Sequence, residues 1–468
     1  MKHRIEKDTL GQVKVPEDAY YGAQTQRAVE NFKVSSLRLP GSFVRAQAII
    51  KRAAAVANMA SSRLEKEIGR ALIEAADEII VGKFADQFVV DAFQAGAGTS
   101  QNMNVNEVMA NRAAEILGGS KGDYSKVHPN DHANMSQSTN DTIHVAIHIS
   151  GYSEIKERLL PAIENLERQL DKKASEFENV FKSGRTHLQD AVPVSLGQEF
   201  GAYASMMRSS RRRIETAAEA LLEICIGGTA VGTGMNSDSN YIKNSVLEIN
   251  KQTGYKFRSA SNMFEAMQNL DTVVETAGAL RVLITSLIKI ADDFRLLSSG
   301  PQTGLGEIKL PAVQPGSSIM PGKVNPVLAE MLNMVCFHAL GCDMTISRAA
   351  QAGQLELNVM MPIVGYNLLH EIEILTGGIS SFTERCVVGL KADEEKCRFY
   401  AERSPALATA LNPYIGYEKA AALAKEALEK NIPVRELAIS KKIMDIDKLR
   451  EILDIKKMIK NPSKKGEK

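Results

Sequence analysis

The chain has 468 residues, and 57 lysines and arginines against 56 aspartates and glutamates give a net charge of +1. A charge so close to neutral provides no basis for a nucleic-acid partner. Its five cysteines lack CxxC spacing and its eight histidines form no cluster, which argues against a structural metal and favours reduced thiols in a cytoplasmic protein.

The first third of the sequence predicts short elements. Residues 1–31 carry turn residues such as Gly11, Pro16 and Gly22, so we expect irregular structure with short strands there. The charged start has no apolar signal region, and apolar runs such as residues 282–290 are too short to span a membrane. Helices are predicted over residues 43–59, 66–81 and 104–116. Glycines at 96 and 98 interrupt the helical pattern between the second and third of these helices.

The middle of the chain predicts long helices. Residues 151–177, 193–224 and 264–297 are rich in leucine and alanine, and no proline occurs between Pro193 and Pro301. A helix of about thirty residues spans about 45 Å at about 1.5 Å per residue. In the third segment the apolar positions are spaced alternately by four and three, as in a packed bundle. They are Val273, Ala277, Leu280, Ile284, Leu287, Ala291 and Phe294.

The sequence therefore predicts a mostly α protein with a long central helical bundle and smaller N-terminal and C-terminal domains. Its length exceeds what a single core usually fills, and we place the divisions at residues 1–138, 139–392 and 393–468. The first of these domains is expected to be mainly helical with short strands, and the last to be small and helical. Further helices are expected over residues 327–350, 359–383, 419–430, 434–439 and 448–453.

One loop concentrates polar chemistry. Residues 316–326 read GSSIMPGKVNP and follow a stretch broken by glycines and prolines, so they form a loop before the helix expected at residue 327. Asn325 and Pro326 have the chemistry of an N-cap and a first helical position. The loop thus presents two hydroxyls, an ammonium and an amide beside the positive end of a helix, where a carboxylate would be stabilised.

Further polar groups occur in three distant segments, and each segment also has a purely structural interpretation. Ser138 can cap a helix, His187 can be an ordinary core or surface histidine, and residues 96–100 can form only a turn. Lys323 can be a solvated loop lysine. The separate groups are Thr99 and Ser100; Ser138, Thr139 and Asn140; and Thr186 and His187.

Taken together, these segments resemble the fumarase/aspartase superfamily of lyases. The similar stretches are the loop at 316–326, GAGTSQNMNVN at 96–106, HPNDH at 128–132 with SQSTND at 136–141, and GRTHLQD at 184–190. They occur in the family's order and extend nearly end to end. The resemblance implies a fumarase/aspartase-like fold and elimination from a small dicarboxylate.

The resemblance also implies roles for individual residues. Ser317 corresponds to the catalytic base, whose oxyanion needs donors such as Lys323, loop amides and the helix dipole. Lys323 and Asn325 would hold the carboxylate that becomes an aci-acid, assisted by Thr99 and Thr186. Donors for the other carboxylate or the leaving group would be Ser138, Thr139, Asn140 and Ser318, and Ser100 is a further substrate-binding residue beside Thr99. His187 would position substrate, with Glu330 as its orienting carboxylate.

The substrate motifs favour aspartate ammonia-lyase, which releases ammonia from L-aspartate to give fumarate. GAGTS at 96–100, STND at 138–141, LQD at 188–190 and GQLELNVM at 353–360 are more similar to that branch. HPND at 128–131 is similar to fumarate hydratases, which remain the alternative. Argininosuccinate and adenylosuccinate lyases lack this form of the loop. A non-catalytic structural helical bundle is a remote alternative, because every polar cluster is filled.

The resemblance further implies a homotetramer whose active sites are shared, each built from three chains. A small dicarboxylate is the expected substrate, with no nucleic acid or membrane partner. No cofactor is expected to be required and no metal ligand is assigned, although an activating divalent cation is compatible with the sequence. A cytoplasmic location is expected.

Overall fold

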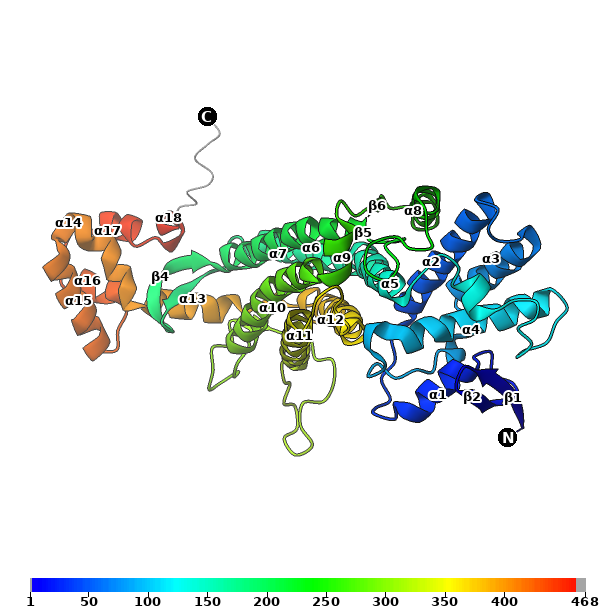
Figure 1. The fold of residues 1–468 in the computed structure, drawn as a ribbon. Coiled ribbons are helices and arrows are strands. Elements are labelled where there is room, and N and C mark those ends of the chain that lie inside the picture. Colours follow the sequence, from blue (N-terminus) through cyan, green and yellow to red (C-terminus); the bar gives the residue numbers. More distant parts are fainter. Residues whose placement is uncertain (1, 460–468) are drawn as a thin grey trace. The chain divides into compact units, whose positions relative to one another are not determined.

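The computed structural model describes residues 2–459, and the chain divides into two compact units. The first unit contains the chain up to Pro161 together with Ser210–Ile284 and Phe337–Thr376. The second contains Ala162–Ser209, Thr285–Cys336 and the chain from Gly377 onward. The mostly helical fold predicted from the sequence is confirmed (Figure 1). The division at residues 138 and 392 stays a prediction, because long helices contribute residues to both units.

The start of the first unit contains more regular structure than the sequence predicts. Strands β1 (His3–Asp8) and β2 (Gly11–Pro16) form an antiparallel hairpin, as expected, but a helix, α1 (Ala23–Asn31), follows it. Propensity did not reveal this helix because contacts with α4 fix its first turn. Helices α2 (Gly41–Ala60), α3 (Lys66–Ile80) and α4 (Thr99–Ile116) then pack around a common apolar core.

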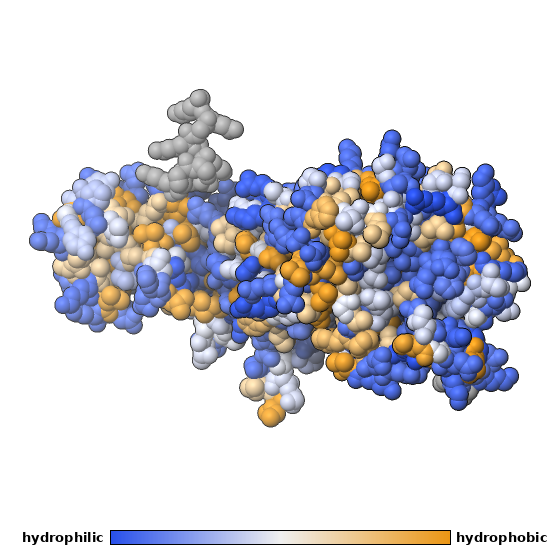
Figure 2. Space-filling view, in the orientation of Figure 1, coloured by the Kyte–Doolittle hydropathy of each residue, from blue (hydrophilic) through white to orange (hydrophobic). Residues whose placement is uncertain are grey.

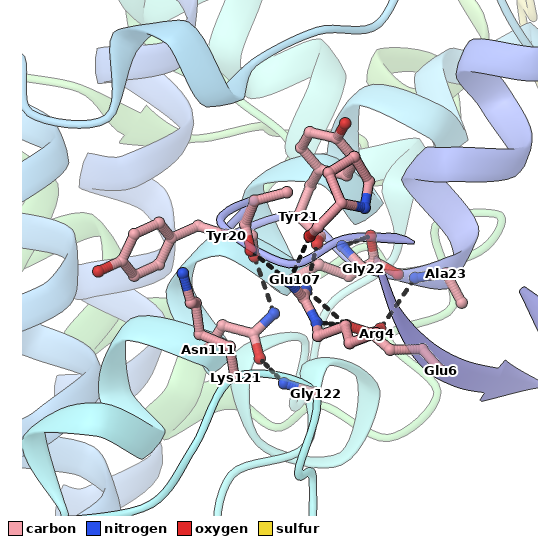
Figure 3. Close-up of polar contacts among 12 residues, drawn as sticks. Arg4, Glu6, Tyr20, Tyr21, Gly22, Ala23, Glu107, Asn111, Lys121 and Gly122 are labelled. Carbon is pink, nitrogen blue, oxygen red and sulfur yellow. Dashed lines mark hydrogen bonds and ion pairs between the residues drawn. The ribbon is translucent and has the colours of Figure 1, made fainter. Parts of the chain in front are cut away.

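Glu107 on α4 fixes the start of α1. Its carboxylate accepts a hydrogen bond from the backbone N–H group of Gly22 at 2.8 Å (Figure 3). It also accepts from the backbone N–H groups of Gln24 and Thr25 at 2.9 and 3.1 Å. These are N–H groups that the first turn of a helix leaves without a partner in the helix. Arg4 adds hydrogen bonds to the carbonyls at residues 19 and 21. The N-terminal segment is therefore held on the same helix that begins with Thr99.

The next long helix begins twelve residues earlier than the sequence predicts. Helix α5 (Thr139–Glu154) passes through a π-helical segment (Ile155–Leu159) into α6 (Leu160–Glu176). The second predicted helix, residues 193–224, is shortened at its start, because β3 (Phe181–Thr186) and β4 (Gln189–Ser195) form a hairpin that precedes α7 (Leu196–Ala218). Pairing with β3 is a tertiary effect that single-segment propensity does not contain.

The third long helix is interrupted near its start. Helix α8 (Ser239–Thr253) is followed by a short α9 (Met263–Gln268) and then by α10 (Asp271–Leu297). Asn269 lies in an extended conformation, and its side chain accepts a hydrogen bond from the Leu270 N–H group at 2.9 Å, which separates α9 from α10. The predicted apolar seam of α10 is confirmed, because all seven of its residues are fully buried.

The second half of the chain matches its predicted helices closely. Helices α11 (Val327–Gln351) and α12 (Met361–Phe382) appear in olive and yellow in Figure 1. Between α10 and α11 lies a segment with one short strand, β7 (Ile308–Lys309), paired with β8 (Lys391–Ala392). The C-terminal elements are α13 (Glu394–Arg403), α14 (Asn412–Ile415), α15 (Tyr417–Glu429), α16 (Val434–Ser440), α17 (Ile446–Ile452) and α18 (Ile455–Met458).

Candidate functional site

In the first unit, Thr99 and Ser100 form the first turn of α4. The sequence placed them before a helix expected at residue 104, but a glycine turn starts the helix five residues earlier. Gly98 has φ +82°, and a Cβ there would lie 3.0 Å from Ile143. The preceding N–H group, of Ala97, donates to the Val359 carbonyl at 2.7 Å. The turn is therefore fixed, and it leaves the Thr99 side chain exposed at the helix start.

Ser138, Thr139 and Asn140 occupy the start of α5. Ser138 is the N-cap, as its structural interpretation predicts: its hydroxyl accepts from the Asn140 N–H at 3.2 Å, and its own N–H donates to Asp141. The Asn140 side chain donates to the Ala230 carbonyl at 2.7 Å. Capping leaves the Thr139 and Asn140 side chains half-buried at the positive end of the helix.

A buried lysine that the sequence did not single out joins these two helix starts. Lys51 on α2 donates to the side-chain oxygens of Asn102 and Asn134 at 2.7 and 2.9 Å. Asn102, one turn into α4, in turn donates to Thr139 Oγ1 at 3.1 Å. One ammonium thus lies behind the starts of both α4 and α5. The sequence signal was a single lysine on the buried face of an alanine-rich helix.

Asp141 is the acidic counterpart of this lysine in the first unit. Its carboxylate accepts hydrogen bonds from the backbone N–H groups of Ser138, Gly227 and Thr229 at 3.0 to 3.1 Å. Burial raises the pKa of Asp141 to about 7 and lowers the pKa of Lys51 to about 7. Both shifts have the same physical cause, because each charge has lost its contact with water.

In the second unit, the loop at residues 316–325 is closed at its base. The Gly316 N–H donates to the Lys323 carbonyl at 2.9 Å, and the Asn325 side chain donates to the Gly316 carbonyl at 2.6 Å. A Cβ on Gly316 would lie 2.2 Å from the Lys323 oxygen, so only glycine fits there. Asn325 is therefore not the N-cap that the sequence predicts. Pro326 precedes the first helical residue of α11, and the Asn325 amide closes the loop instead.

Ser317 lies inside this loop with its oxygen directed at backbone donors. Its Oγ accepts hydrogen bonds from the N–H groups of Ile319 and Met320 at 3.2 and 3.0 Å. A cavity of about 460 Å³ is lined by residues 312–317 and 320–324 of the loop. Ser318 and Lys323 are exposed, and the end of the loop carries exposed hydrophobic side chains that include Ile319, 85% exposed (Figure 2).

Thr186 and His187 lie at the end of the β3–β4 hairpin, also in the second unit. Both side chains are exposed, and His187 and Leu188 adopt positive φ values of 54° and 59° in the turn. Among residues 2–459, no hydrogen bond or ion pair joins His187 to Glu330 or to the loop that carries Ser317. The roles assigned to Thr186, His187 and Glu330 stay predictions.

Comparisons with known proteins place these segments in one family. The family described as "Lyase" matches residues 11–341, and the family described as "Fumarase C C-terminus" matches residues 407–460. The chain belongs to the fumarase/aspartase superfamily. The resemblance based on the sequence motifs is therefore confirmed.

Several relatives of this superfamily are similar over almost their whole length. An aspartate ammonia-lyase from Bacillus sp is 49% identical over 96% of both chains. A class II fumarate hydratase from Thermosynechococcus vestitus is 48% identical over 93% of both. A fumarate lyase:delta crystallin from Brucella melitensis, in a crystal structure bound to cobalt, has a TM-score of 0.95 and 46% identity over 98% of this chain and 100% of that chain. A class II fumarase from Schistosoma mansoni has a TM-score of 0.94 and 39% identity, covering 98% and 99% of the two chains.

The helix starts in the first unit and the Ser317 loop in the second unit can each stabilise negative charge. The starts of α4 and α5, which Lys51 connects through hydrogen bonds, can stabilise a carboxylate without the charge of Lys323 in the loop. The Ser317 oxygen already accepts two N–H groups, and such donors stabilise negative charge on a hydroxyl oxygen. The structure thus offers anion recognition in one unit and a stabilised serine oxygen in the other.

We predict that Lys51→Met raises the KM for fumarate about tenfold, which corresponds to about 1.4 kcal/mol of lost binding. In the unmodified protein, Lys51 loses its proton and Asp141 gains negative charge as the pH rises through about 7. Both changes weaken attraction for a dianion, so KM should rise between pH 6 and pH 8. The Lys51→Met variant should show a shallower rise in steady-state assays.

Lys66→Met is the matched control, because Lys66 is an exposed lysine at the first residue of α3 and is far in sequence from the starts of α4 and α5. It should leave KM and its pH dependence unchanged. An identical pH profile in the Lys51→Met and unmodified proteins would contradict an electrostatic role for Lys51.

Proposed function

We propose that this lyase eliminates ammonia reversibly from L-aspartate to give fumarate, with Ser317 as the base. The observation that carries the proposal is the pair of backbone N–H groups directed at Ser317 Oγ. A serine hydroxyl is too weak an acid to ionise unaided in neutral water, so a serine base requires such donors. Removal of a proton beside the β-carboxylate gives an aci-carboxylate, and loss of ammonia completes the elimination.

The remaining predicted residues supply charge and hydrogen bonds to the two carboxylates. Lys323 and Asn325, assisted by Thr99 and Thr186, would hold the carboxylate that becomes the aci-acid. The residues Ser138, Thr139 and Asn140 at the start of α5, together with Ser318, would hold the other carboxylate or the leaving group, and Ser100 at the start of α4 would also bind substrate. Two helix N-termini backed by a buried ammonium support this second assignment, because an anion is favoured there.

His187 and Glu330 complete the proposed site. The exposed imidazole at the end of the β3–β4 hairpin would contact substrate, and Glu330 would orient it. Within residues 2–459, no hydrogen bond or ion pair joins the two side chains, so the orienting role of Glu330 rests on the family resemblance.

Fumarate hydratase is the second candidate function, and sequence identity does not separate it from aspartate ammonia-lyase. Relatives of both names are similar at 48% or 49% identity over nearly the whole chain. L-Aspartate and L-malate share the same dicarboxylate frame, so the carboxylate-binding groups hold both. The preference for aspartate rests on the motifs at residues 96–100, 138–141 and 353–360.

We predict that the purified protein forms fumarate from L-aspartate and makes aspartate from fumarate in concentrated ammonium. L-Malate dehydration should be absent or at least about a hundredfold slower, a difference of about 2.7 kcal/mol in transition-state stabilisation. The ultraviolet absorbance of fumarate measures both reactions. Rapid hydration of fumarate without amination would establish the hydratase instead.

We predict that Ser317→Ala lowers kcat by about two to four orders of magnitude, the range expected on removal of a general base. The melting temperature should not change, because the loop contributes little to the apolar core. Ser318→Ala is the matched control on the adjacent exposed hydroxyl and should have a smaller effect. Full activity of pure Ser317→Ala protein would exclude Ser317 as the base.

We propose a homotetramer whose active sites are shared between chains. By length and composition alone, helix α11 is long and apolar enough to cross a membrane, whereas the sequence predicts no apolar run of that length. Its exposed side chains include Met334, Phe337 and Met344, 65%, 59% and 56% exposed. Large exposed apolar side chains concentrated on one helix favour contact with another protein surface. A second copy of this chain is the proposed partner.

We predict that sedimentation analysis gives a mass close to four times the chain mass of 51.1 kDa. Phe337→Asp should shift the mass toward smaller species and lower the activity, because an ionised carboxylate would be buried in the interface. Lys391→Asp, also at an exposed position but outside α11, should leave the mass unchanged. A fully active species of single-chain mass would contradict shared sites.

The proposed chemistry requires no cofactor. Within residues 2–459, no group of three or more histidine, cysteine, aspartate or glutamate side chains has the arrangement of a metal site. An activating divalent cation stays compatible with the proposal, and adding and removing Mg²⁺ in the aspartate assay tests it. We also propose a cytoplasmic location, which fractionation of cells that produce the protein would check.

A further inference from the structure

A network of buried and partly buried charges lies along β3 of the β3–β4 hairpin in the second unit. The Glu307 carboxylate is fully buried and accepts both Nη atoms of Arg185 at 3.0 and 2.9 Å. The Lys182 ammonium lies 2.9 Å from Glu307 and 2.9 Å from Glu199. Two positive and two negative side chains are thus paired, as buried charges require. The Arg185 guanidinium also lies over the Tyr400 ring, 5.6 Å from its centroid.

An irregularity in the hairpin makes this network possible. Lys182 and Arg185 are three residues apart, so a regular strand would direct them to opposite faces. The register shifts between Ser183 and Arg185, where Gly184 fits because a Cβ would lie 2.7 Å from the Val192 carbonyl oxygen. A bulge of this kind changes the alternation of side chains. Both cations therefore reach the same carboxylate.

The backbone of Glu307 is as firmly held as its side chain. Its N–H donates to the Leu297 carbonyl at 2.9 Å, at the end of α10. Its carbonyl accepts from the Asp393 N–H at 2.9 Å and from Cys397 Sγ at 3.6 Å. Strand β7, which pairs with β8, begins at the next residue. Glu307 is consequently a fixed point ten residues before Ser317.

We propose that Glu307 is a positioning residue for the proposed reaction, holding both the hairpin that carries Thr186 and His187 and the start of the loop that carries Ser317. Arg185 directly precedes Thr186 and His187 in the sequence, and it transmits the position of Glu307 to them. The proposal deepens the proposed function and rests on it. Neither Glu307 nor Arg185 is assigned a contact with substrate. They act through the residues that follow them in the chain.

The test compares Glu307→Gln, Glu307→Asp, Arg185→Met and Arg185→Lys with the unmodified protein in whichever reaction that protein catalyses. Displacement of reacting groups by about 1 Å can cost about a hundredfold in rate, so kcat should fall about ten- to a hundredfold in Glu307→Gln and Arg185→Met. Glu307→Asp and Arg185→Lys keep the charge and should recover part of the loss. The double variant Glu307→Gln/Arg185→Met should lose little more than the worse single variant, because both remove the same contact.

Lys309→Met is the matched control. It removes an ion pair with Asp393 at 2.7 Å in the same β7–β8 region, and within residues 2–459 no hydrogen bond or ion pair joins Lys309 to the hairpin. Its kcat should stay within twofold of the unmodified protein. A comparable loss in Lys309→Met would mean that any disturbance of β7 lowers activity, and it would overturn a specific role for Glu307.

Hydrogen–deuterium exchange gives a readout that does not depend on activity. In Glu307→Gln, peptides covering residues 183–192 and residues 310–325 should both exchange faster, while peptides from α7 should not. Faster exchange in both segments with unchanged kcat would show a merely structural bridge and overturn the proposal. If Glu307→Gln does not fold, Glu307→Asp decides by the same two readouts. If the unmodified protein does not act on aspartate, only the proposed function is contradicted. The role of Glu307 can still be tested by hydrogen–deuterium exchange and by the rate of fumarate hydration.

Discussion

Charge buried away from water must be paired, and this constraint organises the polar parts of both units. Lys51 and Asp141 in the first unit, and Lys182 and Glu307 in the second, are buried and surrounded by hydrogen-bond partners, and the partly buried Arg185 binds Glu307. An isolated ion in such surroundings would cost several kcal/mol. Each network therefore fixes the geometry of the segments that supply it, and those segments carry the candidate site residues.

The loop that carries Ser317 combines a fixed base with an exposed end. Gly316 and Asn325 close its base through backbone and amide hydrogen bonds, and the strand that begins at Ile308 fixes the chain before it. Between these points, Ile319 and Lys323 face solvent. A serine in such a loop keeps its two backbone donors while the surrounding side chains stay free to contact substrate.

Recognition of the dicarboxylate and choice of the leaving group are separate physical problems. In the proposed site, the positive helix ends of α4 and α5 would attract a dicarboxylate whether it bears an ammonium or a hydroxyl group. Neutral oxygen acceptors such as Thr139 and Asn140 can receive a hydrogen bond from either substituent. These groups therefore do not distinguish an ammonium from a hydroxyl substituent.

The sequence by itself determined the family, the helical class and the segments in which the polar residues lie, because these depend on local composition and motif order. It also determined the apolar seam of α10, since helical spacing is a local property. Only the tertiary structure decided where α4 and α5 begin, because residues distant in sequence, such as Val359 and Gly227, fix the turns before or beside them. Lys51 and Glu307 were likewise visible only in the fold: their importance comes from partners 51 and 122 residues away along the chain, and no local pattern encodes such a contact.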